Sequence, residues 1–205
     1  MTASDPILDP TLRILQQLFA TATHDASSAM CRWTNGLISL SLDEVREVPL
    51  EAVSTEFAIG NDLLTMVVLN LDGEKGGQLI LAFDEANGRK LAASLLGREV
   101  CTDSEWTPLE ESALKETGNI LGCAYMNALT RLIDTELVPS PPYFMQDYGA
   151  SVLEQAVMTQ AMTSDNVLVC NTRFQRDDED LDWSVFFVPT QALRNAMEDA
   201  LQTSC

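Results

Sequence analysis

Apolar residues along the chain switch between helical spacing and strand-like runs, and they do so twice in the same order. The first half begins at Asp9-Pro10, an N-cap residue followed by a proline at the first helical position. It predicts, in order, a helix to about Trp33, a short strand over 37–42, a two-stranded hairpin over 63–83 and a helix from about Glu85 to Leu96, ended by Gly97.

The second half repeats this order from Thr107-Pro108-Leu109-Glu110, which has the spacing of a capping box. Its predicted elements are a helix from this box to about Thr135, a turn or edge segment at Pro139, Pro141 and Pro142, a short helix over 152–162, a hairpin over 166–188 and a final helix over 192–201.

Each half on its own would leave an apolar face exposed, so the two halves are expected to pack together. The sequence therefore predicts one α+β domain over residues 1–205, with a first half at 9–100 and a second half at 107–205. We expect the two helix–strand–hairpin–helix halves to share one sheet.

Charge and composition exclude several classes of function. The net charge of −19, from 12 basic and 31 acidic residues, disfavours nucleic-acid and membrane partners. The N-terminal residues lack the basic and apolar regions of a signal peptide, which predicts a cytoplasmic protein. Five scattered cysteines are typical of reduced thiols, and a single histidine, His24, excludes a histidine-based metal cluster. We expect no bound metal, and we interpret the acidic stretch 177–182 as a solvated turn rather than a calcium site.

The long helix of the second half combines strong helical periodicity with poor helix formers. Thr117, Gly118, Asn119 and Gly122 together lower its helix propensity by roughly 2–3 kcal/mol relative to alanine. A helical wheel places these residues in the core: Leu109, Ala113, Leu114, Thr117, Leu121, Ala124, Ala128 and Leu132. Ser112, Glu116 and Asn119 lie on the opposite, exposed side. The pattern favours a docking or catalytic surface, with Gly118 and Gly122 allowing another backbone to approach closely.

The spacing Ser112-x3-Glu116-x2-Asn119-x22-Pro142 resembles the signature [DS]-x3-E-x2-N-x22-P of the CheC/CheX/FliY phosphatases. The surrounding LKETGNILGCAYMNAL resembles the CheC helix in particular. The resemblance implies hydrolysis of the aspartyl phosphate on a response-regulator receiver domain, typically CheY. It also implies a six-stranded sheet with pseudo-twofold symmetry and both long helices on one side.

The same resemblance implies a role for each motif residue. Asn119 would orient the hydrolytic water, and Glu116 would pair with an active-site lysine of the receiver. Ser112 would support the contact surface, Pro142 would shape the following segment, and the glycines would leave room for the partner. The receiver would supply the phosphoryl group and its Mg²⁺, so this chain needs no cofactor of its own.

The first half is predicted to have lost its site. A gapless alignment of Leu15 with Leu114 matches the motif to Arg13, Gln17, Ala20 and Asp43. A register shifted by one residue gives Ile14, Leu18, Thr21 and Glu44 instead. Neither alternative restores the motif carboxylate or amide, so we expect one site per chain.

Two alternatives remain open at this point. The chain could be a non-catalytic adaptor of the same fold that docks receivers or flagellar-switch components, or a CheX-like dimer; a monomer and a homodimer are both compatible with the sequence. The resemblance to CheC also implies the deamidase CheD as a partner, which the missing first site disfavours. A self-contained hydrolase is disfavoured by the single histidine, His24.

Overall fold

A computed structural model describes residues 10–36, 38–49, 52, 63–100, 105–149, 151, 166–176 and 179–203. The first half contributes α1 (Pro10–Trp33), β1 (Ser39–Pro49), β2 (Leu63–Leu71), β3 (Gly77–Asp84) and α3 (Glu85–Leu96). The second half contributes α4 (Pro108–Ile133), β4 (Tyr143–Tyr148), β5 (Asn166–Arg176), β6 (Glu179–Pro189) and α6 (Gln191–Thr203).

The strands form one six-stranded sheet in the order β1-β5-β6-β3-β2-β4, and each pair of neighbouring strands is antiparallel. The predicted α+β class and shared sheet are confirmed. The first strand of each half pairs with the hairpin of the other half, because β1 pairs with β5 and β4 pairs with β2. The two halves are therefore interleaved, and neither contains a complete sheet by itself.

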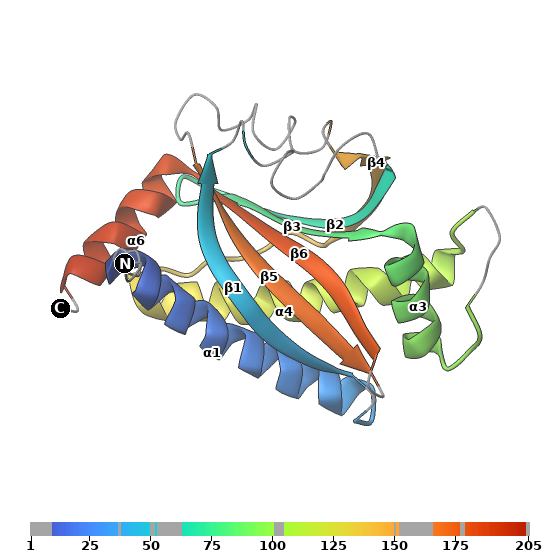
Figure 1. The fold of residues 1–205 in the computed structure, drawn as a ribbon. Helices are drawn as coiled ribbons and strands as arrows, with labels where there is room; N and C mark the ends of the chain where they lie inside the picture. The colour runs from blue at the N-terminus through green and yellow to red at the C-terminus, as the bar shows by residue number, and fades with distance from the viewer. Residues whose placement is uncertain are drawn as a thin grey trace, which may run out of the picture.

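Two layers follow from the alternation of side chains along the strands. In β2, Val67 and Leu69 point into the main core with the helices, whereas Met66 and Val68 belong to a smaller cluster on the other face. Figure 1 shows α1 and α4 side by side along one face of the sheet, with α3 and α6 at opposite ends of this helical layer. At the centre, the hydroxyl of buried Tyr125 on α4 contacts the Thr23 hydroxyl of α1 at 3.0 Å.

The sequence located most of these elements but misjudged two strands. β1 runs to Pro49, well beyond the predicted 37–42, because a bulge between Leu42 and Glu44 breaks the alternation on which the prediction depends. Glu179 and Asp182 belong to β6, where they pair in register with Arg176 and Arg173, so the turn is shorter than predicted. The predicted short helix over 152–162 lies outside the described residues.

Two features are absent from the part of the chain that the structure describes. None of the described helices is long and apolar enough to cross a membrane. No group of three or more His, Cys, Asp or Glu side chains that could hold a metal ion occurs among these residues.

Candidate functional site

The start of α4 is fixed by a capping box tied to α3. Thr107 accepts a hydrogen bond from the Glu110 backbone nitrogen at 3.3 Å, and the Glu110 carboxylate accepts one from the Thr107 nitrogen at 2.8 Å. Buried Glu110 also lies 2.8 Å from Arg98 and 3.7 Å from Arg89 of α3. The Arg89 guanidinium lies over the Trp106 ring, 4.2 Å from its centroid. These contacts hold the first turn of α4 in a defined position.

The electrostatics of Glu110 agree with this anchoring role. Burial raises the pKa of its carboxyl group, but the hydrogen bonds from Thr107 and the charges of Arg98 and Arg89 outweigh burial, so the pKa is lowered overall. Glu110 is therefore ionised at neutral pH although it is buried.

The face of α4 that meets the sheet explains its poor helix formers. A Cβ atom on Gly118 would lie 2.5 Å from Val67 Cγ1, and one on Gly122 would lie 2.7 Å from Leu69 Cδ2. Both glycines are buried against β2. The expectation that they leave room for a partner is wrong, because the space that they provide is filled by strand β2 of this chain.

The buried face is also turned relative to the helical wheel. Leu109, predicted to lie in the core, is 57% exposed. The glycine side of the helix faces the sheet, which rotates the buried face by roughly 60° away from Leu109 at about 100° per residue. Glycine adds nothing to a hydrophobicity pattern, so the helical wheel did not identify the side of Gly118 and Gly122 as buried.

The opposite face of α4 brings three of the motif residues together. Ser112 and Glu116 are exposed and Asn119 is half-buried, as their spacing along one helix face requires. Leu109 precedes them and half-buried Cys123 follows them on the same face. We call these five residues, Leu109, Ser112, Glu116, Asn119 and Cys123, the outer stripe of α4. The stripe is a projecting helix surface with one carboxylate, one hydroxyl and one carboxamide.

Cys123 is a member of the stripe that the sequence analysis did not single out. Its thiol donates a hydrogen bond to Asn119 Oδ1 with a sulfur–oxygen distance of 3.7 Å. Burial raises the pKa of this thiol, and the negative charge of Glu116 raises it further. The signal for Cys123 was its position four residues after Asn119, which places both side chains on one face.

Pro142 lies apart from the outer stripe, in the segment between α4 and β4. Backbone pairing of this segment with the end of β2 is shown by the Ser140 nitrogen, which donates to the Asn70 carbonyl at 2.7 Å. Directly after Pro142, Tyr143 and Phe144 of β4 pair with Val68 and Val67 of β2. Pro142 thus precedes β4, which pairs with β2, the strand that packs against Gly118.

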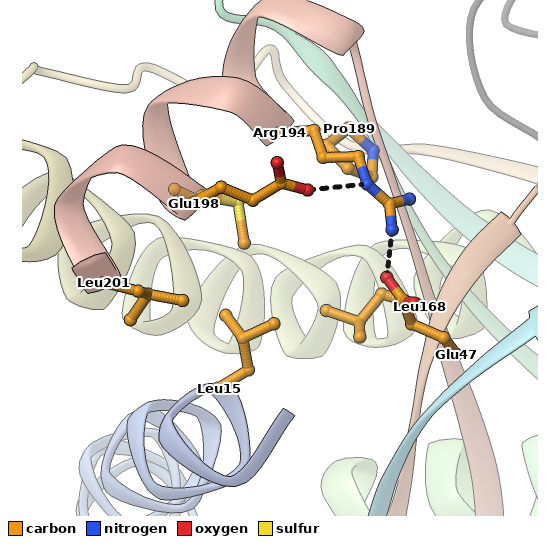
Figure 2. Close-up of a pocket in the computed structure, with 8 residues that line it drawn as sticks. Leu15, Glu47, Leu168, Pro189, Arg194, Glu198 and Leu201 are labelled. Atoms are coloured by element: carbon orange, nitrogen blue, oxygen red, sulfur yellow. Dashed lines mark hydrogen bonds and ion pairs between the residues drawn. The ribbon is translucent and has the colours of Figure 1, made fainter. Parts of the chain in front are cut away.

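A pocket of about 30 Å³ lies between α1, α6 and the sheet, and it contains no motif residue. Figure 2 shows its apolar lining, with Arg194 at one side paired to Glu47 and to Glu198, the latter at 3.3 Å. The outer stripe is on α4, so the pocket and the stripe are separate features.

The two long helices have equivalent burial patterns. Leu15, Phe19, Ala22, Thr23, Ala26 and Met30 of α1 are buried, and so is every α4 residue 99 positions later. The register shifted by one residue would instead match buried Ala22 and Ala26 to half-buried Ile120 and Ala124. Burial therefore supports the gapless register, in which Arg13, Gln17 and Ala20 replace the motif residues.

No protein-family model matches the chain, but comparison with known proteins finds sequence relatives. The chain is 21% identical over 193 residues to the CheY-P phosphatase CheC of Bacillus subtilis (strain 168). The alignment covers 92% of each protein.

Three solved structures have the same fold. FliY of Thermotoga maritima is similar with a TM-score of 0.74 at 16% identity, covering 98% of this chain and 100% of that chain. A chain of the FliG–FliM complex from H. pylori has a TM-score of 0.66 at 9% identity, with coverages of 92% and 100%. A chain of the CheX–CheY complex with BeF₃ and Mg²⁺ from Borrelia burgdorferi has a TM-score of 0.54 at 19% identity, with coverages of 85% and 96%.

Proposed function

We propose that this chain, which is similar to proteins of the CheC/CheX/FliY family, is a phosphatase that hydrolyses the aspartyl phosphate of a CheY-like receiver domain. The observation that carries this proposal is the outer stripe, where Glu116 and Asn119 project from one face of a helix anchored at its start. A projecting site suits a reaction whose phosphoryl group lies in a cleft of the partner.

The proposed chemistry needs no nucleophile from this chain. A water molecule attacks the phosphorus, the bond between phosphorus and the aspartyl oxygen breaks, and inorganic phosphate leaves the restored carboxylate. Asn119 orients this water in line with the bond that breaks, which is catalysis by positioning. The receiver supplies the Mg²⁺ that balances charge on the phosphoryl group. The CheX–CheY structure, which contains BeF₃ and Mg²⁺, supports such a partner.

Glu116 and Ser112 are proposed to set the docking geometry. Glu116 is exposed one turn before Asn119, where it can pair with a lysine of the receiver and fix the register between the two proteins. Ser112 is exposed one further turn away and extends the contact. Pro142 has a structural role at the start of β4.

We place one active site in each chain. In the gapless register, Gln17 and Ala20 occupy the positions of Glu116 and Asn119 and lack both the carboxylate and the amide. The same proposal includes a cytoplasmic location and CheD as a further partner. It is compatible with a monomer and with a homodimer.

A second candidate function is a non-catalytic adaptor that binds receivers or flagellar-switch proteins. It is favoured by the fold similarity to the FliM middle domain of H. pylori. An adaptor needs a docking surface but no water-orienting amide, so the two functions differ in what Asn119 does.

The test measures loss of aspartyl phosphate from a panel of phosphorylated receivers, CheY and the host's own regulators included, with Mg²⁺. We expect wild type to accelerate the loss and Asn119→Ala to lower the rate by about 100-fold. Binding of a beryllofluoride-loaded receiver should persist in Asn119→Ala, because Glu116 and Ser112 remain.

Gln17→Ala, at the α1 position matched to Glu116, is the control and should leave the rate within about twofold. If no receiver loses phosphate faster in the presence of wild type, the adaptor function is favoured. If Asn119→Ala loses binding in step with activity, Asn119 is a docking residue. If Gln17→Ala impairs the rate as strongly as Glu116→Ala, the prediction of one site is wrong.

A further inference from the structure

We propose that Cys123 is a positioning residue that holds the Asn119 carboxamide in the orientation needed to meet the hydrolytic water. This inference rests on the proposed phosphatase function and deepens it. It assigns a task to a side chain of the outer stripe that lies outside the four-residue motif.

The first support is the contact itself. Cys123 follows Asn119 by one helical turn, and its Sγ donates to Asn119 Oδ1 over 3.7 Å. Both side chains are half-buried, so the bond is formed at the edge of the helix packing rather than in open solvent. A thiol is a weak donor, and its effect is therefore on orientation more than on stability.

The second support is the protonation state. Burial and the nearby charge of Glu116 both raise the pKa of the Cys123 thiol. The thiol therefore keeps its proton at neutral pH and stays a donor. A donor at this position selects the oxygen of the carboxamide over its nitrogen, because the nitrogen of an amide is itself a donor.

The consequence for Asn119 concerns which end of the amide is free. The oxygen and the nitrogen of a carboxamide lie on opposite sides of the group, so an oxygen held by Cys123 directs the nitrogen away from it. The N–H groups are then available to a water oxygen, whose remaining lone pair can attack phosphorus. An amide held in advance also avoids part of the entropy loss of ordering it during docking.

The first half offers a comparison within the same chain. In the gapless register, the positions of Asn119 and Cys123 are held by Ala20 and His24. The half without the catalytic amide thus also lacks the thiol. The pair occurs together on the helix that carries the motif.

The test compares Cys123→Ala, which removes the donor, with Cys123→Ser, which keeps a hydroxyl donor. We expect Cys123→Ala to lower the maximal rate of receiver dephosphorylation about three- to tenfold, as loss of one modest hydrogen bond predicts. Binding of a beryllofluoride-loaded receiver should stay within about twofold. Cys123→Ser should recover most of the rate, and Cys31→Ser, at an exposed cysteine of α1, is the matched control.

A second readout does not depend on any receiver. In a nuclear magnetic resonance spectrum of the free protein, we expect the Asn119 side-chain amide to shift towards the position of a solvated amide in Cys123→Ala and to stay near the wild-type position in Cys123→Ser. An equal loss of rate in both variants, a loss of binding in step with rate, or an unchanged amide signal in Cys123→Ala would overturn the proposal. If wild type dephosphorylates no receiver while the amide signal responds as expected, the proposed function fails but the contact stands.

Discussion

The helices α1 and α4 occupy equivalent places in the two halves but fill them in opposite ways. Phe19 of α1 contacts the rings of Tyr125 and Phe187, with centroid distances of 5.2 and 6.1 Å. Its counterpart in α4 is Gly118, where even a methyl group would collide with Val67. At this position α1 packs through a large aromatic ring, whereas α4 packs through direct contact of its backbone with the sheet. The helix without the ring is the one that carries the motif.

The ends of the two helices differ in the same sense. At the start of α4, Arg89 of α3 reaches Glu110 and covers Trp106. In α6, Arg194 pairs with Glu47 of β1 beside the pocket near Leu15 of α1 (Figure 2). The start of α4 is therefore held by ion pairs to a buried carboxylate, whereas Leu15 of α1 lines a pocket. These contacts hold the start of the helix that carries the motif, where the proposed reaction requires accurate placement.

The largest expected effect comes from removing the aromatic ring of α1. Phe19→Ala should lower the free energy of unfolding by about 3–5 kcal/mol, because the ring is fully buried and leaves a cavity between α1, α4 and β6. Denaturant titration measures the change. The control Gln17→Ala, on the exposed face of the same helix, should stay within about 0.5 kcal/mol. If both variants lowered the free energy of unfolding by the same small amount, the Phe19 ring would not be what stabilises the packing of α1.

The next effect tests the junction between α3 and the start of α4, where Glu110 pairs with Arg89 and Arg98. Glu110→Gln should destabilise the protein by about 2 kcal/mol at pH 7, since charged hydrogen bonds to Thr107 and the pairs with Arg89 and Arg98 are lost. The pKa of Glu110 is lowered on folding, so its contribution is present above the ordinary value of 4.5 and is lost as the pH falls through the folded pKa. The stability difference between wild type and variant should therefore shrink below about pH 4.5.

Unfolding measured from pH 7 down to pH 3 checks this prediction. Glu111→Gln, one position further along, is the matched control and should change stability by no more than about 0.5 kcal/mol at pH 7. A difference between wild type and Glu110→Gln that stays constant across this range would show that the carboxylate charge does not stabilise the junction.

The success of the sequence analysis depended on whether a signal was local. The capping box at Thr107 and Glu110 and the glycine C-cap at Gly97 are short-range features, and the structure confirms both. The grouping of Ser112, Glu116 and Asn119 on one face follows from the helical repeat and is confirmed as well. The catalytic role of these residues stays a prediction.

Two features of the fold depend on long-range contacts that the sequence pattern does not reveal. The exchange of β1 and β4 between the halves depends on pairings far apart in the chain, which no local pattern encodes. The close approach at Gly118 was attributed to a partner protein, because a glycine in a sequence does not show which surface packs against it. Only the position of Val67 shows that this surface belongs to the chain itself.

The smallest expected effect therefore tests which surface needs the glycine. Gly118→Ala should destabilise the protein by about 1 kcal/mol, because overpacking against Val67 exceeds the gain of roughly 1 kcal/mol in helix propensity. Val67→Ala makes room for the new methyl group, so the double variant should be more stable than the sum of the single changes by at least about 0.5 kcal/mol. A stabilising Gly118→Ala, or strict additivity, would contradict close contact with β2. If the double variant also keeps the dephosphorylation rate of Val67→Ala alone, the glycine serves the sheet; a rate that falls despite restored packing would return it to the partner surface.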